Sequence, residues 1–355
     1  MPFTDAELTD WLRTREPGRV AQLHAAADRV RREHVGDAVH LRGLVEISNH
    51  CVRACGYCGI SVHNRAVRRY RMPMAEVVAC ARRAVELGYG TVVLQAGEDP
   101  GLDREWVSDC IRLIKDAGPD LAVTLSLGEQ DEADLAAWRA AGADRYLLRF
   151  EASNPDLFAR IHPPRRGQEP RCRIAQLRMM RRLGYAIGSG VMVGIPGQTW
   201  ADLVNDLRTF QDLDLEMIGI GPWIPHPSTP LAGDLEGAAD PADQVPNDKA
   251  TALSMVALSR ILVPDANLPA TTAVATIDQK HGREDALCAG ANVVMPNLTP
   301  PAFRALYEIY PDKACVNETA EQCHPCLSGR IAKIGRTVGT GRGDAPRQAL
   351  AGITG

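Results

Sequence analysis

The chain lacks the features of a secreted, membrane-spanning or nucleic-acid-binding protein. Residues 1–20 contain no apolar run of the kind found in secretory signals. No apolar stretch approaches the roughly 20 residues that a bilayer-spanning helix needs. The formal net charge of −4 disfavours nucleic acid as a partner, because nucleic acid binds to a concentrated basic face. We therefore expect a cytoplasmic protein that binds neither nucleic acid nor membrane.

Aromatic residues are also scarce, at 5% of the chain, while hydrophobic residues make up 45%. This composition is typical of a globular core built from Val, Ile, Leu and Ala. Disulfides are rare in the cytoplasm, so the ten cysteines indicate metal binding or catalysis more than cross-linking. The length of 355 residues fits two or three domains, or one large α/β barrel with extensions.

Short β-branched runs alternate with amphipathic helical patterns after residue 40. Eight such runs are expected to be strands, at residues 41–48, 91–95, 121–126, 145–150, 187–193, 216–221, 268–273 and 291–296. The alternation predicts an α/β fold, a parallel sheet closed into a (β/α)8 TIM barrel. An open doubly wound sheet is the alternative, but the G-x-G-x-x-G turn of that fold is absent after the first strand. We expect an N-terminal helical extension (1–40), the barrel (41–300) and a C-terminal extension (301–355) that ends in a flexible, Gly-rich tail.

The segment NHCVRACGYCGI follows the first predicted strand and contains Cys51, Cys55 and Cys58. The spacing C-x3-C-x2-C is one thiolate short of a closed tetrahedral zinc site, which His50 or His63 could complete. Three thiolates can also hold a [4Fe–4S] cluster and leave one iron open for another ligand. We favour the cluster, since an open coordination position is what chemistry requires.

Polar residues lie near the end of nearly every predicted strand or directly after it. They are Glu98 and Asp99, then Thr124, Ser126 and Glu129, then Arg149 and Glu151, and finally His226, Thr271, Thr272 and Asn297. Barrel enzymes carry their chemistry at the carboxyl ends of the strands. This distribution predicts one active site at the barrel mouth and argues against a non-catalytic iron–sulfur or zinc scaffold.

An ordered set of segments from about residue 40 to 335 resembles the radical S-adenosylmethionine (SAM) enzymes, in particular the HydE family of [FeFe]-hydrogenase maturases. The segments include EISNHCVRACGYCGI, VVLQAGEDP, VTLSLGE, AGADRYLLRFEASNP, VMVGIPGQT, IGIGPWIPHPSTPL and GANVVMPN. Biotin synthase and methylornithine synthase are relatives of that family. A sulfur-insertion enzyme or mutase of their kinds, acting on a small organic substrate, is therefore the alternative. None of the eight strand segments contains a cysteine, which disfavours biotin synthase, and LSLGE favours HydE over methylornithine synthase.

The resemblance implies that Cys51, Cys55 and Cys58 hold the [4Fe–4S] cluster and that SAM binds its fourth iron. The reduced cluster would cleave SAM to methionine and a 5′-deoxyadenosyl radical. An arginine that aligns with Arg173, or with Arg171 after a slip in register, would contact the SAM carboxylate, as guanidinium groups do. The remaining SAM-contacting positions implied are Tyr57, Gln95, Ser126 and Glu151.

The family's substrate cavity runs down the barrel. Its polar positions match Arg145, Arg149, Thr124, Thr271, Thr272 and Tyr307. They imply a small anionic substrate, which for HydE is an iron complex with carbonyl, cyanide and cysteine ligands used in H-cluster assembly. An electron donor such as ferredoxin or flavodoxin and other hydrogenase maturation proteins are the implied partners. Phe150 departs from the histidine frequent in the family, so no role is carried over to it.

A second cysteine set, Cys315, Cys323 and Cys326, has the spacing C-x7-C-x2-C. It resembles a peripheral site that carries a second iron–sulfur cluster in some HydE proteins. His324 could supply a fourth ligand. A structural zinc site is the alternative, because structural zinc prefers a closed four-ligand site.

Overall fold

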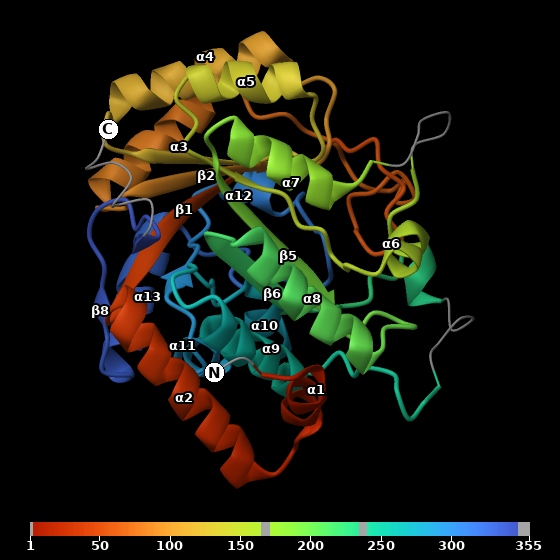
Figure 1. The fold of residues 1–355 in the computed structure, drawn as a ribbon. Coiled ribbons are helices and arrows are strands. Elements are labelled where there is room, and N and C mark those ends of the chain that lie inside the picture. Colours follow the sequence, from red (N-terminus) through yellow and green to blue (C-terminus); the bar gives the residue numbers. More distant parts are fainter. Residues whose placement is uncertain (1–2, 165–170, 234–239, 347–355) are drawn as a thin grey trace.

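Parallel strands form the centre of the molecule and helices surround them (Figure 1). The computed structural model describes residues 3–164, 171–233 and 240–346. The strands run in the order β6-β5-β4-β3-β2-β1-β7, and every pairing is parallel. They are β1 (Ala38–Ser48), β2 (Thr91–Ala96), β3 (Ala122–Ser126), β4 (Arg145–Leu147), β5 (Ala186–Val193), β6 (Met217–Pro222) and β7 (Val293–Val294). Their alternation with helices confirms the predicted α/β barrel.

The ring of strands closes between β6 and β7 through a segment that is not a regular strand. Asn267 bridges to Met217 of β6, and Pro269 bridges to Val293 of β7. The backbone N–H of Ile218 donates to the Asn267 carbonyl at 3.0 Å. The strand expected at 268–273 is therefore reduced to isolated bridges. Proline lacks the N–H that a ladder needs, and Thr271 already precedes helix α10 (Thr272–Ile277).

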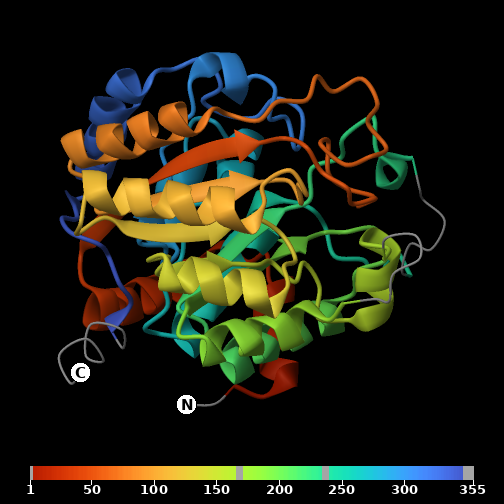
Figure 2. The same cartoon turned by 90° about the horizontal axis from the view of Figure 1, so that it is seen from above.

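Helices cover the outside of the barrel (Figures 1 and 2). They are α3 (Met74–Glu86), α4 (Arg104–Ala117), α5 (Glu132–Ala140), α6 (Pro155–Ile161), α7 (Arg173–Arg182), α8 (Trp200–Leu213), α9 (Lys249–Leu262), α11 (Gly282–Cys288), α12 (Pro301–Arg304) and α13 (Ala320–Lys333), with a short 3-10 turn at Pro230–Ala232. Side-chain caps define several helix starts. The Asp103 carboxylate accepts from the Trp106 N–H, and Thr199 forms a capping box with Asp202. No described helix is long and apolar enough to cross a membrane.

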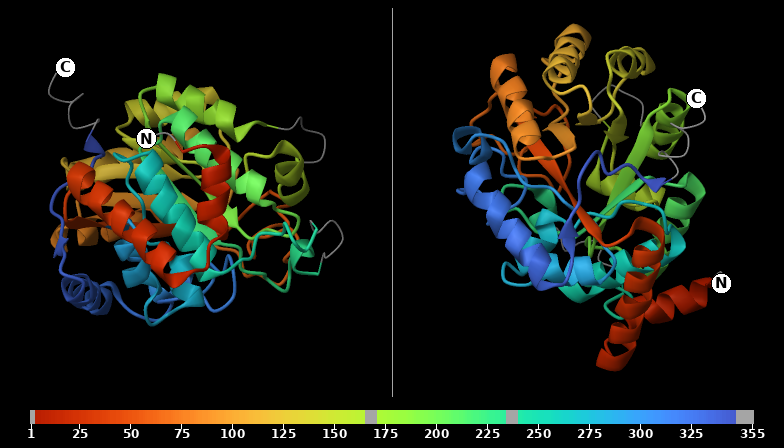
Figure 3. Two further views of the ribbon diagram at one scale, coloured as in Figure 1. Left: turned by 60° about the horizontal axis from the view of Figure 1, so that its bottom comes forward. Right: turned by 90° about the vertical axis from the view of Figure 1, so that its left-hand side faces the viewer.

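The N-terminal helices α1 (Asp5–Arg13) and α2 (Pro17–Val35) lie against α8 and α9 on the outside of the barrel (Figure 3). Leu8 and Leu12 of α1 are fully buried in this contact region. The apolar face of each helix is thus covered by the barrel, which explains why these polar helices form part of the fold.

The C-terminal segment packs under the barrel, where a flexible tail was expected. Strand β8 (Thr337–Val338) pairs in parallel with the start of β1 (Figure 3). Beyond it, the Gly343 carbonyl accepts a hydrogen bond from Arg42 at 2.8 Å, and Asp344 forms an ion pair with Arg145. Pairing and charge thus hold residues 337–344 in place. Residues 347–355 of the expected tail lie outside the described residues.

Candidate active site

A cavity of about 260 Å³ opens at the carboxyl ends of the strands. Segments far apart in the sequence form its wall. Its lining includes Cys51, Cys55, Tyr57 and Cys58 from the loop after β1, then Gln95, Ser126, Arg149, Glu151, Arg173 and Met192, and also Trp223, Ala273, Tyr307 and Tyr310. The structure therefore brings the three cysteines and all five predicted SAM-contacting positions to one cavity.

Hydrogen bonds from its own side chains fix the cysteine loop. The amide of Asn49, which directly follows β1, donates to the carbonyls of Arg68 (2.9 Å) and Leu306 (2.7 Å). The guanidinium of Arg69 donates to the carbonyls of Asn49 and Ile60, both at 2.6 Å. These bonds satisfy carbonyls that a loop without secondary structure would otherwise leave unpaired. The loop is therefore held in shape by the protein itself.

Glycine at position 97 allows the end of β2 to approach this loop. A Cβ atom there would lie 2.2 Å from the His50 carbonyl and 2.8 Å from the Cys51 side chain. Both distances are too short for any larger residue. Gly97 is thus required for the close packing of the second strand end against the first cysteine.

The three thiols suit a metal cluster. All are free of disulfides. Burial and the neighbouring Cys51 raise the pKa of Cys58 to about 12, and burial with the neighbouring Cys58 raises the pKa of Cys55 well above its ordinary value. Three thiolates at these positions would repel one another unless a cation lay among them. Because all three free cysteines line one cavity, their arrangement fits an iron–sulfur cluster with an open iron better than three separate structural thiols.

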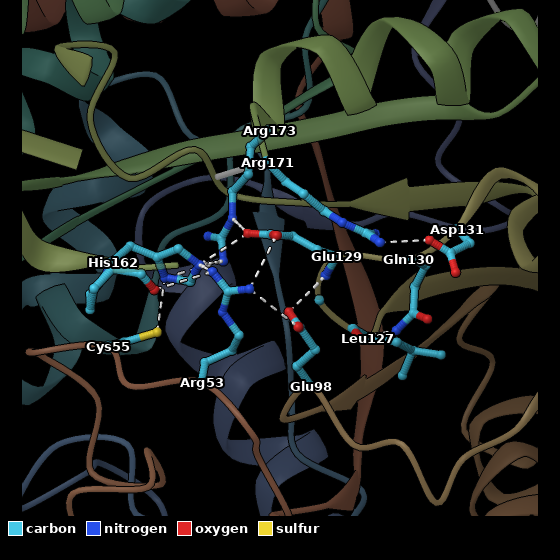
Figure 4. A network of polar contacts seen from close by, with 12 residues as sticks. Arg53, Cys55, Glu98, Leu127, Glu129, Gln130, Asp131, His162, Arg171 and Arg173 are labelled. Carbon is cyan, nitrogen blue, oxygen red and sulfur yellow. Dashed lines mark hydrogen bonds and ion pairs between the residues drawn. The ribbon is translucent and has the colours of Figure 1, made fainter. Parts of the chain in front are cut away.

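Beside the cysteines, Glu129 lies at the centre of a buried polar network (Figure 4). It accepts from Arg173 Nε at 2.9 Å and from Arg53 Nη1 at 3.4 Å. Burial alone would raise its pKa, but the charges of Arg173 and Arg53 and the hydrogen bond from Arg173 lower the pKa of Glu129 to about 2. Burial and the same two arginines lower the pKa of His162 to about 4, so the imidazole is neutral near pH 7.

His162 also contacts the cysteine loop, since its Nδ1 atom lies 2.9 Å from the Sγ atom of Cys55. Sequence reasoning missed both His162 and Arg53. Arg53 lies between two of the cysteines, which was a usable signal. His162 follows α6 in a loop with no periodic pattern, so nothing local marked it.

The structure distinguishes between the two arginines expected at the SAM carboxylate. Arg173 is buried and lines the cavity. Arg171 points the other way and donates to Asp131 at 2.7 Å, with both side chains exposed (Figure 4). At the start of α7 only Arg173 is therefore placed to meet a ligand in the cavity. Its three donor atoms contact Glu129, His162 and the Arg149 carbonyl.

Buried polar atoms without hydrogen-bond partners face the same cavity. Among the described residues, Arg149 Nε, Glu151 Oε2 and Trp223 Nε1 have none. Glu151 Oε2 lies 3.1 Å from Arg149 Nη2 in an ion pair. Glu151 itself has a φ of 62°, a left-handed backbone conformation that costs energy for a residue other than glycine. Unpartnered atoms of both charge types fit a zwitterionic ligand such as SAM.

The predicted substrate positions do not all reach this cavity. Arg149 and Tyr307 line it, and the Tyr307 hydroxyl accepts from Gln95 at 3.3 Å. Thr124 is fully buried, and its Oγ1 has no partner among the described residues. Thr271 donates to the Ile220 carbonyl at 2.8 Å.

Neither Thr124, Thr271 nor Thr272 is among the lining residues. Arg145 begins β4 and lies at the opposite end of the barrel, where Asp344 neutralises it. Phe150 packs against Phe210 of α8, with ring centroids 5.5 Å apart, and does not line the cavity either. Trp223 and Tyr310, which sequence reasoning did not identify, take part in the lining instead.

The second cysteine set is only partly assembled. A hydrogen bond from the thiol of Cys323 lowers the pKa of Cys315, and Arg283 Nη2 lies 3.4 Å from Cys315 Sγ. Cys326 is exposed. His324 Nδ1 lies 3.2 Å from the Tyr89 hydroxyl. The structure thus brings two of the three thiols together and directs the histidine elsewhere.

Comparison with known proteins agrees with this geometry. Residues 45–210 match the family model of the radical SAM superfamily. The chain is 45% identical over 345 residues to the [FeFe] hydrogenase maturase subunit HydE of Thermotoga maritima, which covers 97% of this chain and 94% of that protein. It is 27% identical over 300 residues to the 3-methylornithine synthase of Methanosarcina barkeri, covering 84% of this chain and 80% of that protein.

Solved structures show the same fold. The crystal structure of methylornithine synthase matches with a TM-score of 0.81 at 23% identity, over 99% of this chain and 97% of the other. The hydrogenase maturase HydG matches with a TM-score of 0.74 at 17% identity, over 94% of this chain and 71% of HydG. The cysteine loop at the barrel mouth, the match to the family model and the 45% identity to HydE define a radical SAM enzyme. Within that superfamily, the chain belongs to the HydE family.

Proposed function

We propose that this enzyme acts in [FeFe]-hydrogenase maturation, on an organometallic iron precursor with carbonyl, cyanide and cysteine ligands. The observation that carries the proposal is the placement of the cysteine loop at the mouth of a barrel cavity, in a chain 45% identical to HydE. The cavity, with a volume of about 260 Å³, has the scale of a small-molecule site.

Cys51, Cys55 and Cys58 are proposed to hold a [4Fe–4S] cluster, and the adjoining cavity to hold SAM. Together these groups supply the one-electron cleavage of SAM to methionine and a 5′-deoxyadenosyl radical. The chain's own part is binding and orientation. The carboxylate of Glu151 suits the amino group or ribose hydroxyls of SAM, and the guanidinium of Arg173 suits its carboxylate.

The deeper part of the cavity is proposed to bind the substrate. Arg149 provides a cationic group, and Trp223 provides an indole N–H that has no partner among the described residues. Both favour an anionic or strongly polar ligand. Burial of Tyr310 raises the pKa of its hydroxyl, so this lining residue stays neutral and can donate a hydrogen bond. Tyr307 and Tyr310, both from the C-terminal extension, line the cavity as well.

The proposed partners follow from this chemistry. An external one-electron donor such as ferredoxin or flavodoxin is required, because no side chain of the chain can supply the electron. Other hydrogenase maturation proteins would deliver the substrate or receive the product. We place the protein in the cytoplasm with these partners.

A second metal site is proposed at Cys315, Cys323 and Cys326, holding an iron–sulfur cluster, with structural zinc as the alternative. The contact between Cys315 and Cys323 and the nearby Arg283 guanidinium support thiolate character there. Metal analysis of Cys323→Ser, compared with Cys172→Ser as a control at an exposed cysteine, separates the options. Loss of iron indicates a cluster, and loss of zinc indicates a structural site.

The radical SAM activity can be tested with anaerobically reconstituted protein, dithionite and SAM. Release of 5′-deoxyadenosine is expected from the wild type and from Cys172→Ala, and none from Cys55→Ala. Fully reconstituted wild-type protein that releases none would contradict the assignment. The maturase role has its own test, the activation of apo-hydrogenase with the other maturation factors. Equal activation without this protein would exclude it, and turnover of a small organic substrate would favour a mutase.

A further inference from the structure

The side chain of His162 is held rigidly against one cysteine of the loop. Its Nδ1 atom lies 2.9 Å from Cys55 Sγ, and the two residues are 2% and 7% exposed. The imidazole stacks on Phe158 with ring centroids 5.0 Å apart. The Gly56 N–H donates to the Ile161 carbonyl at 2.9 Å, which ties the end of α6 to the cysteine loop. Stacking thus holds the imidazole, and a backbone hydrogen bond holds the cysteine loop against it.

Two arginines determine which nitrogen of His162 carries the proton. Arg53 Nη2 and Arg173 Nη2 each lie 2.8 Å from His162 Nε2. A guanidinium group can only donate hydrogen bonds, so Nε2 has to be the acceptor. A neutral imidazole whose Nε2 accepts has its proton on Nδ1. The N–H of His162 therefore points at the sulfur of Cys55.

Arg173 Nη2 also lies 3.4 Å from His162 Nδ1, but a Cys55 thiolate can only accept, so its sulfur at 2.9 Å requires the proton on Nδ1. The carboxylate of Glu129 lies beside the same imidazole. Its Oε1 atom lies 3.0 Å from His162 Nε2, but it accepts from Arg173 Nε at 2.9 Å. Arg173 thus donates one N–H to Glu129 and another to His162, and both acceptors face the same guanidinium. Glu129 holds the two arginines in place, and the arginines hold the imidazole.

Cys55 differs from the other two cysteines in the origin of its donor. Backbone N–H groups of Arg53 and Ile60 hydrogen-bond to the sulfurs of Cys51 and Cys58. The donor at Cys55 comes from a side chain 107 residues away. It can therefore be altered by substitution without changing the loop backbone.

We propose that His162 donates its Nδ1–H to the Cys55 thiolate when that cysteine ligates the cluster, and so raises the cluster's reduction potential. One-electron reduction places additional negative charge on the cluster and its thiolate ligands. A hydrogen bond to a thiolate stabilises that form more than the oxidised form, and such bonds are a known determinant of cluster potential. His162 is a positioning residue in this role, and the electron comes from the external donor. The inference rests on the cluster assignment above, and does not depend on the substrate.

A matched pair of substitutions tests the proposal. Asparagine at 162 places its amide nitrogen close to the position of Nδ1, whereas glutamine places it close to Nε2. The readout is an anaerobic redox titration of the reconstituted cluster, followed by electron paramagnetic resonance without SAM. In His162→Gln we expect the reduced-to-oxidised ratio at a fixed potential to fall about tenfold, which is about 59 mV for one electron. His162→Asn and the stacking control Phe158→Leu should titrate close to the wild type.

Two results would overturn the proposal, an unchanged potential in His162→Gln or an equal shift in both variants. If His162→Gln fails to retain iron, a measurement on the wild-type protein tests the proposal instead. With 15N-labelled histidine, pulsed electron paramagnetic resonance of the reduced cluster should show a coupled histidine nitrogen that is lost in His162→Asn. Its absence rejects the proposal. Neither measurement uses SAM or hydrogenase, so failure here is distinguishable from failure of the maturase function.

Discussion

Arg145, the first residue of β4, forms a buried ion pair with Asp344 of the C-terminal segment at the end of the barrel opposite the cysteine loop. The Arg145 guanidinium also donates to Thr91 Oγ1 at 2.9 Å and to the Arg342 carbonyl at 3.0 Å. The end of the chain thus neutralises and covers this end of the barrel.

Removing the partner of Arg145 should destabilise the protein. In Asp344→Ala a buried guanidinium loses its counter-charge, which should reduce the free energy of unfolding by about 2 kcal/mol, below the value for a fully buried pair because Asp344 is partly exposed. A urea midpoint on the apo-protein measures it. Asp109→Ala, which breaks an exposed pair with Arg112, should change it by less than about 0.5 kcal/mol. Equal effects of the two variants would show that the Arg145 pair contributes little.

Asp206 should make stability depend on pH. Burial raises its pKa from 3.8 to about 7, against the hydrogen bonds from Ser153. Between these values the folded state binds the proton more tightly than the unfolded state, so stability falls as pH rises from about 4 to 7. Asp206→Asn remains neutral, and at pH 8 it should be more stable than the wild type by roughly 3 to 4 kcal/mol. At pH 4 the two proteins should unfold at similar urea concentrations, and a constant difference across this range would contradict the explanation.

Substitution of Thr124 tests whether its buried hydroxyl has a structural or a functional role. Its Oγ1 has no partner among the described residues, so the isosteric Thr124→Val should stabilise the apo-protein by about 1 kcal/mol. Because Thr124 is fully buried and does not line the cavity, hydrogenase activation and 5′-deoxyadenosine release should both stay unchanged. Unchanged activation together with the gain in stability would remove Thr124 from the substrate site.

Glu151 should contribute to SAM affinity. Its Oε2 atom is buried at the cavity and accepts no hydrogen bond from the described residues. Glu151→Gln should weaken SAM binding to the reconstituted enzyme about tenfold, the usual effect of losing one hydrogen bond to a charged group. Equilibrium dialysis measures it. Glu216→Gln serves as the control, because Glu216 pairs with Arg181 away from the cavity. Equal affinities of the Glu151 variant and the wild type would remove Glu151 from the SAM site.

The hydrophobic periodicity of the sequence determined the order of strands and helices in the barrel. The cysteine spacing indicated an iron–sulfur site. Parallel connections bring all carboxyl ends of the strands to one side of the sheet. For that reason Cys51, Gln95, Ser126 and Glu151 could be expected at one cavity before any coordinates were known, and the structure places them there.

Only the tertiary structure decided which residues of the same type reach that cavity. Arg145 and Arg149 are four residues apart, which is about 13 Å in an extended chain. Arg145 therefore pairs with Asp344 at one end of the barrel, and Arg149 lines the cavity at the other. Arg171 and Arg173 differ by two positions at the start of one helix, and only one of them faces inward.

The contact between Cys55 and His162 likewise depends on how the loop after α6 packs against the loop after β1. The packing of Asp344 under the barrel is of the same kind. Such contacts between distant loops have no sequence period, because side chains there follow neither the helical nor the strand repeat. The sequence therefore specified the site's chemistry, and loop packing specified the environment of its cysteines.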